Sequence, residues 1–115
     1  MENAIYNELC LRGYAVDVGV VEINERQENG KYVRKQTEVD FVCNKADERI
    51  YVQSAFTLPT TEKRLQEERP LVNIADSFRK VIITADNTLS HHDENGVFIL
   101  GLREFLLDDK SLETR

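Results

Sequence analysis

The chain has 115 residues, of which 41% are hydrophobic and 31% are charged. This length supports one domain with one core but not two, and the charged fraction is ordinary for a folded soluble protein. The formal net charge is −6. Because affinity for phosphate backbones comes largely from Lys and Arg, this charge argues against a protein that grips nucleic acid unaided.

The N-terminal half of the chain predicts one helix and three strands. Residues 2–12 carry apolar side chains at helical spacing, and residues 14–23 alternate apolar and polar side chains as a half-buried strand does. The Asn29-Gly30 pair accepts positive φ, so the chain is expected to reverse there as a hairpin. The returning strand is expected at residues 31–44, and a third strand at residues 49–56.

A second helix is expected to begin near residue 60. Thr60 or Thr61 can cap its N-terminus, and an acid in the first turn favours the helix dipole. Pro70 cannot donate its backbone hydrogen bond, so it is expected to kink or end this helix. Residues 71–76 could then resume it.

The remaining segments complete a mixed α/β fold. Residues 81–84 form a short apolar run, typical of a strand covered on both faces. A polar loop at residues 90–96, a strand at 97–100 and a helix at 102–107 follow. The predicted order is α-β-β-β-α-β-β-α, which argues for a mixed sheet flanked by helices in a single domain, residues 1–115.

Cysteine usage and the first residues indicate a cytoplasmic protein. Cys10 falls in a helical pattern and Cys43 in a strand pattern, without metal-ligand spacing, so two buried reduced thiols are expected. Met1 is followed at once by Glu2, so no signal peptide is expected. No run approaches the ~20 apolar residues that span a bilayer. We therefore expect no contact with a membrane.

The strongest candidate for a functional site joins the second and third strands. Glu38 and Asp40 are two apart, and Gln53 follows Asp40 by thirteen residues, with Ala55 two further on. Strand alternation places Glu38 and Asp40 on one face of their strand, and Gln53 and Ala55 on one face of the next. Glu38 is more simply a solvated strand residue, which leaves Asp40 as the main candidate.

These motifs and the order of elements resemble the restriction-endonuclease-like fold, the PD-(D/E)xK superfamily. More closely, the chain is similar to the C-terminal domain of unknown function in predicted bacterial and archaeal AAA-type ATPases. The stretches that carry the resemblance are Glu2–Leu9 with Arg12-Gly13-Tyr14, Thr37–Val42, Tyr51–Ala55, and Gly96–Leu102 with Phe105–Asp108.

The resemblance implies that the chain is a C-terminal fragment of a longer ATPase. In that family the segment similar to Glu2–Leu9 continues from an upstream region. No Gly-x-x-x-x-Gly-Lys-Ser/Thr string occurs in this chain, so ATP is expected to bind in the absent N-terminal module. The expected partner is that ATPase module in cis.

The resemblance also implies a degenerate metal-dependent nuclease motif. Nucleases of this fold share a Glu on the first helix, an Asp in the second strand and Glu-x-Lys in the third. Asp40 matches the Asp, and Glu8 or Glu2 could match the helical Glu, with Glu8 preferred. Gln53 occupies the position of the acid and Ala55 that of the lysine. In such sites the acids hold Mg²⁺ and the lysine assists the attacking water, so no catalytic residue is assigned with the lysine missing.

Two lysines could in principle replace the missing one. Lys63 lies on the second predicted helix. Lys35 shares its parity with Val39 and Phe41, which places it on the face opposite Asp40 unless a bulge intervenes.

Three other features favour a plain structural interpretation. His91-His92-Asp93-Glu94 combines imidazoles with acids, but adjacent residues rarely converge on one ion, so a polar turn is expected. Lys31, Arg34 and Lys35 are the nearest approach to a basic strip, and a solvated hairpin arm is favoured. Phe56 is expected in the core rather than in a base-stacking platform.

The sequence thus favours a non-catalytic, nuclease-like accessory or interaction domain that contacts nucleic acid or a partner protein. Asp40 would then be structural, accepting a hydrogen bond from Gln53 across the strands. One alternative is a divergent Mg-dependent nuclease that uses Asp40 and a helix glutamate. Another is a protein–protein scaffold, with a dimer formed through an exposed strand edge.

Overall fold

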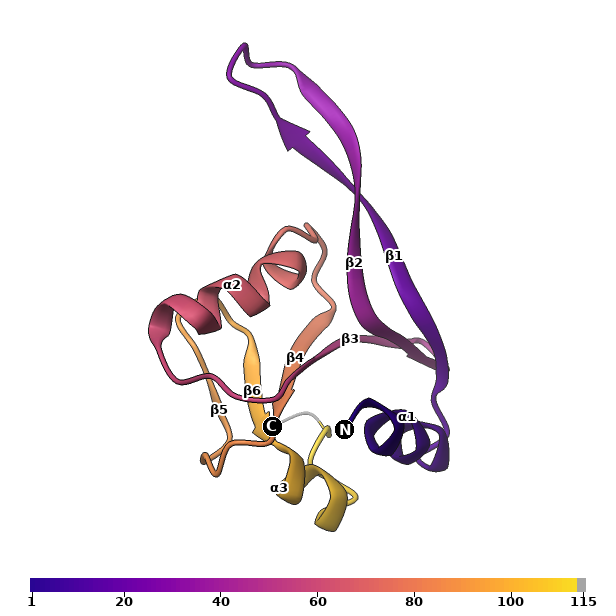
Figure 1. Ribbon diagram of the computed structural model, residues 1–115. Helices are drawn as coiled ribbons and strands as arrows, with labels where there is room; N and C mark the ends of the chain where they lie inside the picture. The colour runs from indigo at the N-terminus through magenta and orange to yellow at the C-terminus, as the bar shows by residue number, and fades with distance from the viewer. Residues whose placement is uncertain (114–115) are drawn as a thin grey trace.

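The computed structural model describes residues 1–113 as one mixed sheet flanked by three helices (Figure 1). The six strands lie in the order β1-β2-β3-β4-β6-β5. The elements are α1 (Glu2–Leu11), β1 (Ala15–Arg26), β2 (Tyr32–Lys45), β3 (Glu48–Ala55), α2 (Thr61–Val72), β4 (Arg79–Thr84), β5 (His91–His92), β6 (Phe98–Gly101) and α3 (Leu102–Leu107). The α/β class and the flanking helices agree with the sequence prediction.

The sheet combines an antiparallel meander with parallel strands. β1, β2 and β3 pair antiparallel, while β3, β4 and β6 run parallel to one another. Parallel neighbours need a long connection, and α2 supplies the one between β3 and β4. The polar loop predicted at residues 90–96 is partly wrong, because His91 and His92 pair with Ile99 and Phe98 and form the edge strand β5.

Alternating side chains of the central strands build two apolar layers. Ile50 and Val52 of β3 pack toward α1 and α3, whereas Tyr51 and Ala55 pack toward α2. The run at residues 81–84 divides in the same way, which confirms a strand covered on both faces. Within residues 1–113, no helix is both long and apolar enough to cross a membrane.

A β-bulge interrupts the alternation of β2. Asp17 lies opposite Val42 but Gly19 lies opposite Val39, so β2 carries one extra residue there. Val39 and Val42 consequently both pack with the α2 layer, while Phe41 packs with the α1 layer. Gly19 permits the close approach, because a Cβ at this position would lie 2.4 Å from Val39 Cγ2 and 2.7 Å from Val42 Cγ2.

Beyond the bulge, β1 and β2 leave the sheet as a solvated hairpin arm (Figure 1). We use "the arm" for residues 18–39, of which Gly19 and Val39 are buried at its base. Two of its cations face acids of the opposite strand: Lys35 Nζ lies 3.0 Å from Glu25 Oε2, and Arg34 Nε lies 3.8 Å from Glu22 Oε2. The predicted solvated arm is therefore confirmed, and Arg34 and Lys35 of the predicted basic strip are paired with acids.

Helix α2 begins as predicted but passes through its proline. The Thr60 hydroxyl accepts a hydrogen bond from Lys63 N at 3.1 Å, which confirms Thr60 as the N-cap. Of the two effects expected of Pro70, an end of the helix is wrong, since the helix continues to Val72. Pro70 stands in the last turn, where one lost backbone bond is offset by the complete burial of Leu71.

Two buried positions predicted from the pattern are exposed instead. Phe56 follows the last residue of β3 and has 75% of its surface exposed. Cys10 is exposed on α1, while Cys43 is buried as expected, and both thiols are free. A short periodic pattern gives no means of knowing which helix face a distant segment will cover.

A buried arginine ties α1 to the C-terminal segment. The guanidinium of Arg12 donates to the backbone oxygens of Phe105 and Asp108 and to the Ser111 hydroxyl. It also lies 4.5 Å from the centre of the Phe105 ring and 3.3 Å from Glu8 Oε1. Its side chain is only 8% exposed, so its charge depends on these partners.

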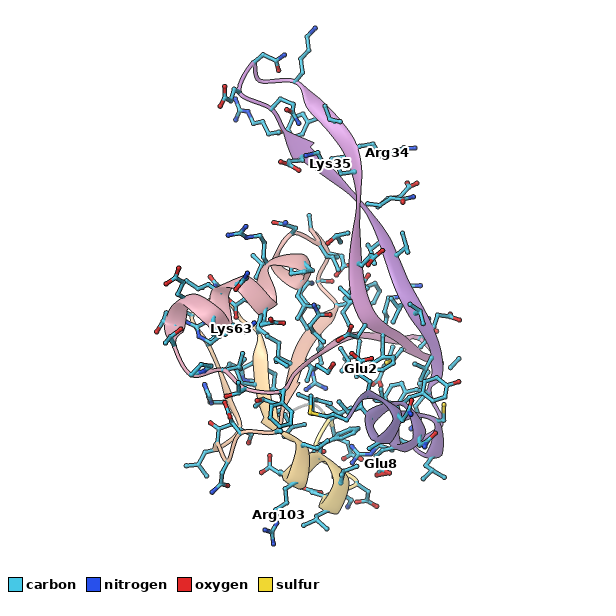
Figure 2. All side chains as sticks on the ribbon, in the orientation of Figure 1. Glu2, Glu8, Arg34, Lys35, Lys63 and Arg103 are labelled. Carbon is cyan, nitrogen blue, oxygen red and sulfur yellow. The ribbon has the colours of Figure 1, made fainter. Side chains whose placement is uncertain are left out.

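Replacing Arg12 should therefore destabilise the fold. We expect Arg12→Ala to lower the free energy of unfolding by about 3 kcal/mol, because several buried acceptors lose their donor. Urea denaturation measures this loss. Arg103→Ala is the matched control, since Arg103 is exposed on α3 (Figure 2) and its loss should change the free energy by less than about 0.5 kcal/mol. Equal losses in both variants would contradict the role of Arg12.

Candidate functional site

Side chains replace the backbone ladder where the arm leaves β3. The β2–β3 register ends at Phe41 opposite Val52. At the next position the Asp40 N–H donates to Gln53 Oε1 at 2.9 Å. Asp40 Oδ2 in turn accepts from the Ser54 N–H at 2.7 Å and from the Ser54 hydroxyl at 2.8 Å. We call Asp40, Gln53 and Ser54 the clasp.

The clasp differs from the predicted pairing of Asp40 with Gln53. The two residues do meet, but Gln53 accepts from the Asp40 backbone, and the Asp40 carboxylate bonds to Ser54 instead. Ser54 lies two residues after Val52 and so shares its face of β3, which packs in the α1 layer. The Asp40 carboxylate therefore lies toward α1, on the face opposite to Ala55.

Of the two helix glutamates considered, the structure brings Glu2 and not Glu8 to Asp40. The Ser54 hydroxyl lies 3.2 Å from Glu2 Oε1, so the acids of Glu2 and Asp40 flank one hydroxyl. Glu8 is paired with Arg12 at 3.3 Å. Figure 2 shows Glu2 on the side of α1 toward the strands and Glu8 below the helix.

The position of the missing lysine is part of the core. Ala55 is 5% exposed and packs in the α2 layer. Neither proposed replacement lies near the clasp: Lys35 pairs with Glu25 on the arm, and Lys63 Nζ pairs with Glu67 Oε1 at 2.7 Å on α2 (Figure 2). The structure thus places Glu2 and Asp40 at one hydroxyl, while Lys35 and Lys63 are engaged elsewhere.

The clasp has limited capacity for a metal ion. In the part of the chain that the structure describes, no group of three or more His, Cys, Asp or Glu is arranged to hold one. Mg²⁺ commonly takes one or two carboxylates and several waters, so Glu2 and Asp40 could contribute ligands. A metal at Asp40 Oδ2 would have to compete with two short hydrogen bonds from Ser54.

A second polar cluster joins α2 to the turn between β5 and β6. Arg64 Nη1 lies 2.6 Å from Asp93 Oδ2 and 3.3 Å from Glu68 Oε2, and Arg64 Nη2 lies 2.6 Å from Glu94 Oε1. Asn95 Nδ2 donates to Glu68 Oε1 at 2.5 Å. Glu68 is 1% exposed. In the sequence, this cluster is indicated only by the i, i+4 spacing of Arg64 and Glu68, because the other partners lie far along the chain.

The polar turn predicted at residues 91–94 is confirmed for its acids. Asp93 and Glu94 turn toward Arg64, whereas His91 and His92 are exposed on β5. The His92 ring packs at 4.8 Å from the Phe98 ring. The four side chains therefore diverge and do not form a metal site.

A further hollow lies away from the clasp, at the start of β3 and β4. It has a volume of about 760 Å³ and is lined by Lys45, Arg49 and Arg79 together with Tyr14 and Phe78. Each cation is held by a neutral oxygen or an aromatic ring. Exposed acids line the same hollow, so its charges are balanced overall.

The comparisons with known proteins add one relative of unknown role. No known protein-family model matches the chain. The chain is 37% identical over 84 residues to an uncharacterized protein from Haemophilus influenzae. The match covers 73% of this chain but only 17% of that protein's length.

Loss of the Asp40 carboxylate should cost stability. We expect Asp40→Ala to lower the free energy of unfolding by about 2 kcal/mol, because the Ser54 N–H and hydroxyl lose a charged acceptor. Asp40→Asn keeps an acceptor and should lose about half as much. Urea denaturation should show little change for the control Glu2→Gln, since Glu2 is exposed. A loss in Asp40→Ala no larger than in Glu2→Gln would show that the clasp is not structural.

Proposed function

We propose that the chain is a non-catalytic, nuclease-like accessory domain that acts as an interaction module in cis with an AAA-type ATPase module. One observation carries the proposal: the Asp40 carboxylate is bonded to Ser54, while Ala55 lies in the core on the opposite face. Cleavage of a phosphodiester needs positive charge placed where negative charge develops. Within residues 1–113, no lysine or arginine is hydrogen-bonded or ion-paired to Asp40, Gln53 or Ser54.

The comparison supports a role within a larger protein. The similar stretch makes up 17% of the Haemophilus influenzae protein, so in that protein it is one segment among others. ATP binding and turnover would belong to a module outside this chain. The chain would contribute contacts.

The exposed surface of the arm favours a protein partner over nucleic acid. The arm presents Val18 at 84% exposure and Tyr32 at 68%, and the outer edge of β1 has no neighbouring strand among the described residues. Exposed strand edges with apolar side chains pair readily with other chains. Arm cations that are paired with acids have little to offer a phosphate backbone.

A divergent nuclease remains the second candidate because Glu2 and Asp40 flank one hydroxyl. Such an enzyme would use these two acids for Mg²⁺ and would take its missing cation from a partner. A dimeric scaffold through the edge of β1 is the third. Light scattering tests the dimeric scaffold by measuring the oligomeric state. A chain that stays monomeric at high concentration would exclude it.

A cleavage assay separates the first two candidates. We expect the purified chain with Mg²⁺ or Mn²⁺ to leave single- and double-stranded DNA and RNA intact, at the level of the Asp40→Ala variant. The reason is the absent cation beside the clasp. Cutting that disappears in Asp40→Ala and Glu2→Gln but persists in Arg103→Ala would establish the nuclease and refute the proposal.

A further inference from the structure

The contact between α2 and the β5–β6 turn contains two buried carboxyl groups and one guanidinium. The side chains of Glu68 and Asp93 are 1% and 3% exposed, and both lie against Arg64. Glu94 also reaches Arg64, but its side chain is 62% exposed and solvated. If both buried carboxyls ionise, Arg64 neutralises only one of them. A shared proton relieves this excess negative charge.

Glu68 is the member of the pair that holds the proton. Burial, and then its hydrogen bond with Asp93, raise the pKa of Glu68 to about 7. Burial opposes ionisation of Asp93 as well, but hydrogen bonds from Glu68 and from the Val97 and Asn95 N–H groups lower the pKa of Asp93. A protonated Glu68 can therefore donate to an ionised Asp93.

Asp93 also organises the turn. Its Oδ1 accepts from the Asn95 N–H at 2.9 Å and from the Val97 N–H at 3.0 Å. The adjoining β5 pairs with β6 through only two residues, His91 and His92. The edge strand therefore adjoins a turn that α2 holds in two ways: Arg64 pairs with Asp93 and Glu94, and Glu68 accepts from Asn95 beside the buried Asp93 carboxyl.

We propose that Glu68 and Asp93 form a proton-operated latch, which holds the β5–β6 turn against α2 while Glu68 is protonated and loosens when it ionises. Opening would free β5 and uncover the edge of β6 to a partner strand. This inference does not depend on the proposed accessory function.

The sign of the pH effect follows from the pKa of Glu68. Its ordinary value is 4.5 and its folded value is about 7, so the folded protein holds the extra proton between these values. The stabilisation is complete below about 4.5 and is lost as pH rises through about 7. Asp93 acts only at lower pH, because its pKa falls below 3.8. The pKa of Arg64 is raised, mainly by its hydrogen bond to Glu94 and further by the charges of the nearby acids. Arg64 therefore stays charged.

Amide hydrogen exchange of Asn95 and Val97 tests the latch. After correction for the intrinsic effect of pH, their opening equilibrium should rise by about tenfold or more between pH 5.5 and 8.5. Glu68→Gln mimics the protonated acid, since its amide can donate to Asp93 and accept from Asn95. It should abolish this rise. If Glu68→Gln does not fold, Asp93→Asn removes the same repulsion and should also abolish it.

Two controls isolate the pair from its surroundings. Glu94→Gln removes a solvated acid on the same guanidinium, and His91→Asn removes the imidazole ring that lines a hollow with Arg64. Both variants should retain the rise. A flat profile in the unmodified chain, a rise that persists in Glu68→Gln, or a rise that vanishes in His91→Asn would overturn the proposal.

Discussion

The arrangement of the molecule depends on the point where β2 parts from β3. Backbone hydrogen bonds end at Phe41 and Val52, and the polar groups exposed by this separation need new partners. Asp40, Gln53 and Ser54 supply them with side-chain hydrogen bonds of 2.7–2.9 Å. β3 can then remain central in the sheet while the hairpin arm extends away from it. This geometry explains the carboxylate at Asp40 without a catalytic or metal-binding role.

Local sequence signals were enough for most of the fold. Thr60 caps α2, and the apolar run in β4 is covered on both faces, as pattern and capping chemistry indicate. The failures arise from tertiary contacts. The continuation of α2 through Pro70 depends on the burial of Leu71, and β5 exists because β6 offers its edge.

The candidate site was predictable in its residues but not in its geometry. Spacing along the strands indicated Asp40 and Gln53, and the structure brings them together. Ser54 was missed because strict alternation assigned the neighbouring positions to the site. The bulge opposite Gly19 and the packing of Val52 determine toward which face of the sheet the Asp40 carboxylate points. Neither can be predicted from the residue pattern of one strand. Buried partners 25–29 residues apart, such as Glu68 and Asp93, leave still less trace in the sequence.

The clasp and the proposed loss of nuclease chemistry are two aspects of one arrangement. Under the proposed function, Asp40 is retained because it bridges β2 and β3, and Ala55, which the resemblance matches to the lysine, lies in the core. The account would fail if the acids still served a metal ion.

Paramagnetic broadening by Mn²⁺ tests that point most directly. With amide resonances of the chain assigned, we predict that Mn²⁺ at sub-millimolar concentration broadens no signals selectively around Asp40, Ser54 and Glu2. Selective broadening centred on these three residues, and absent in Asp40→Asn, would contradict the account and identify a working metal site.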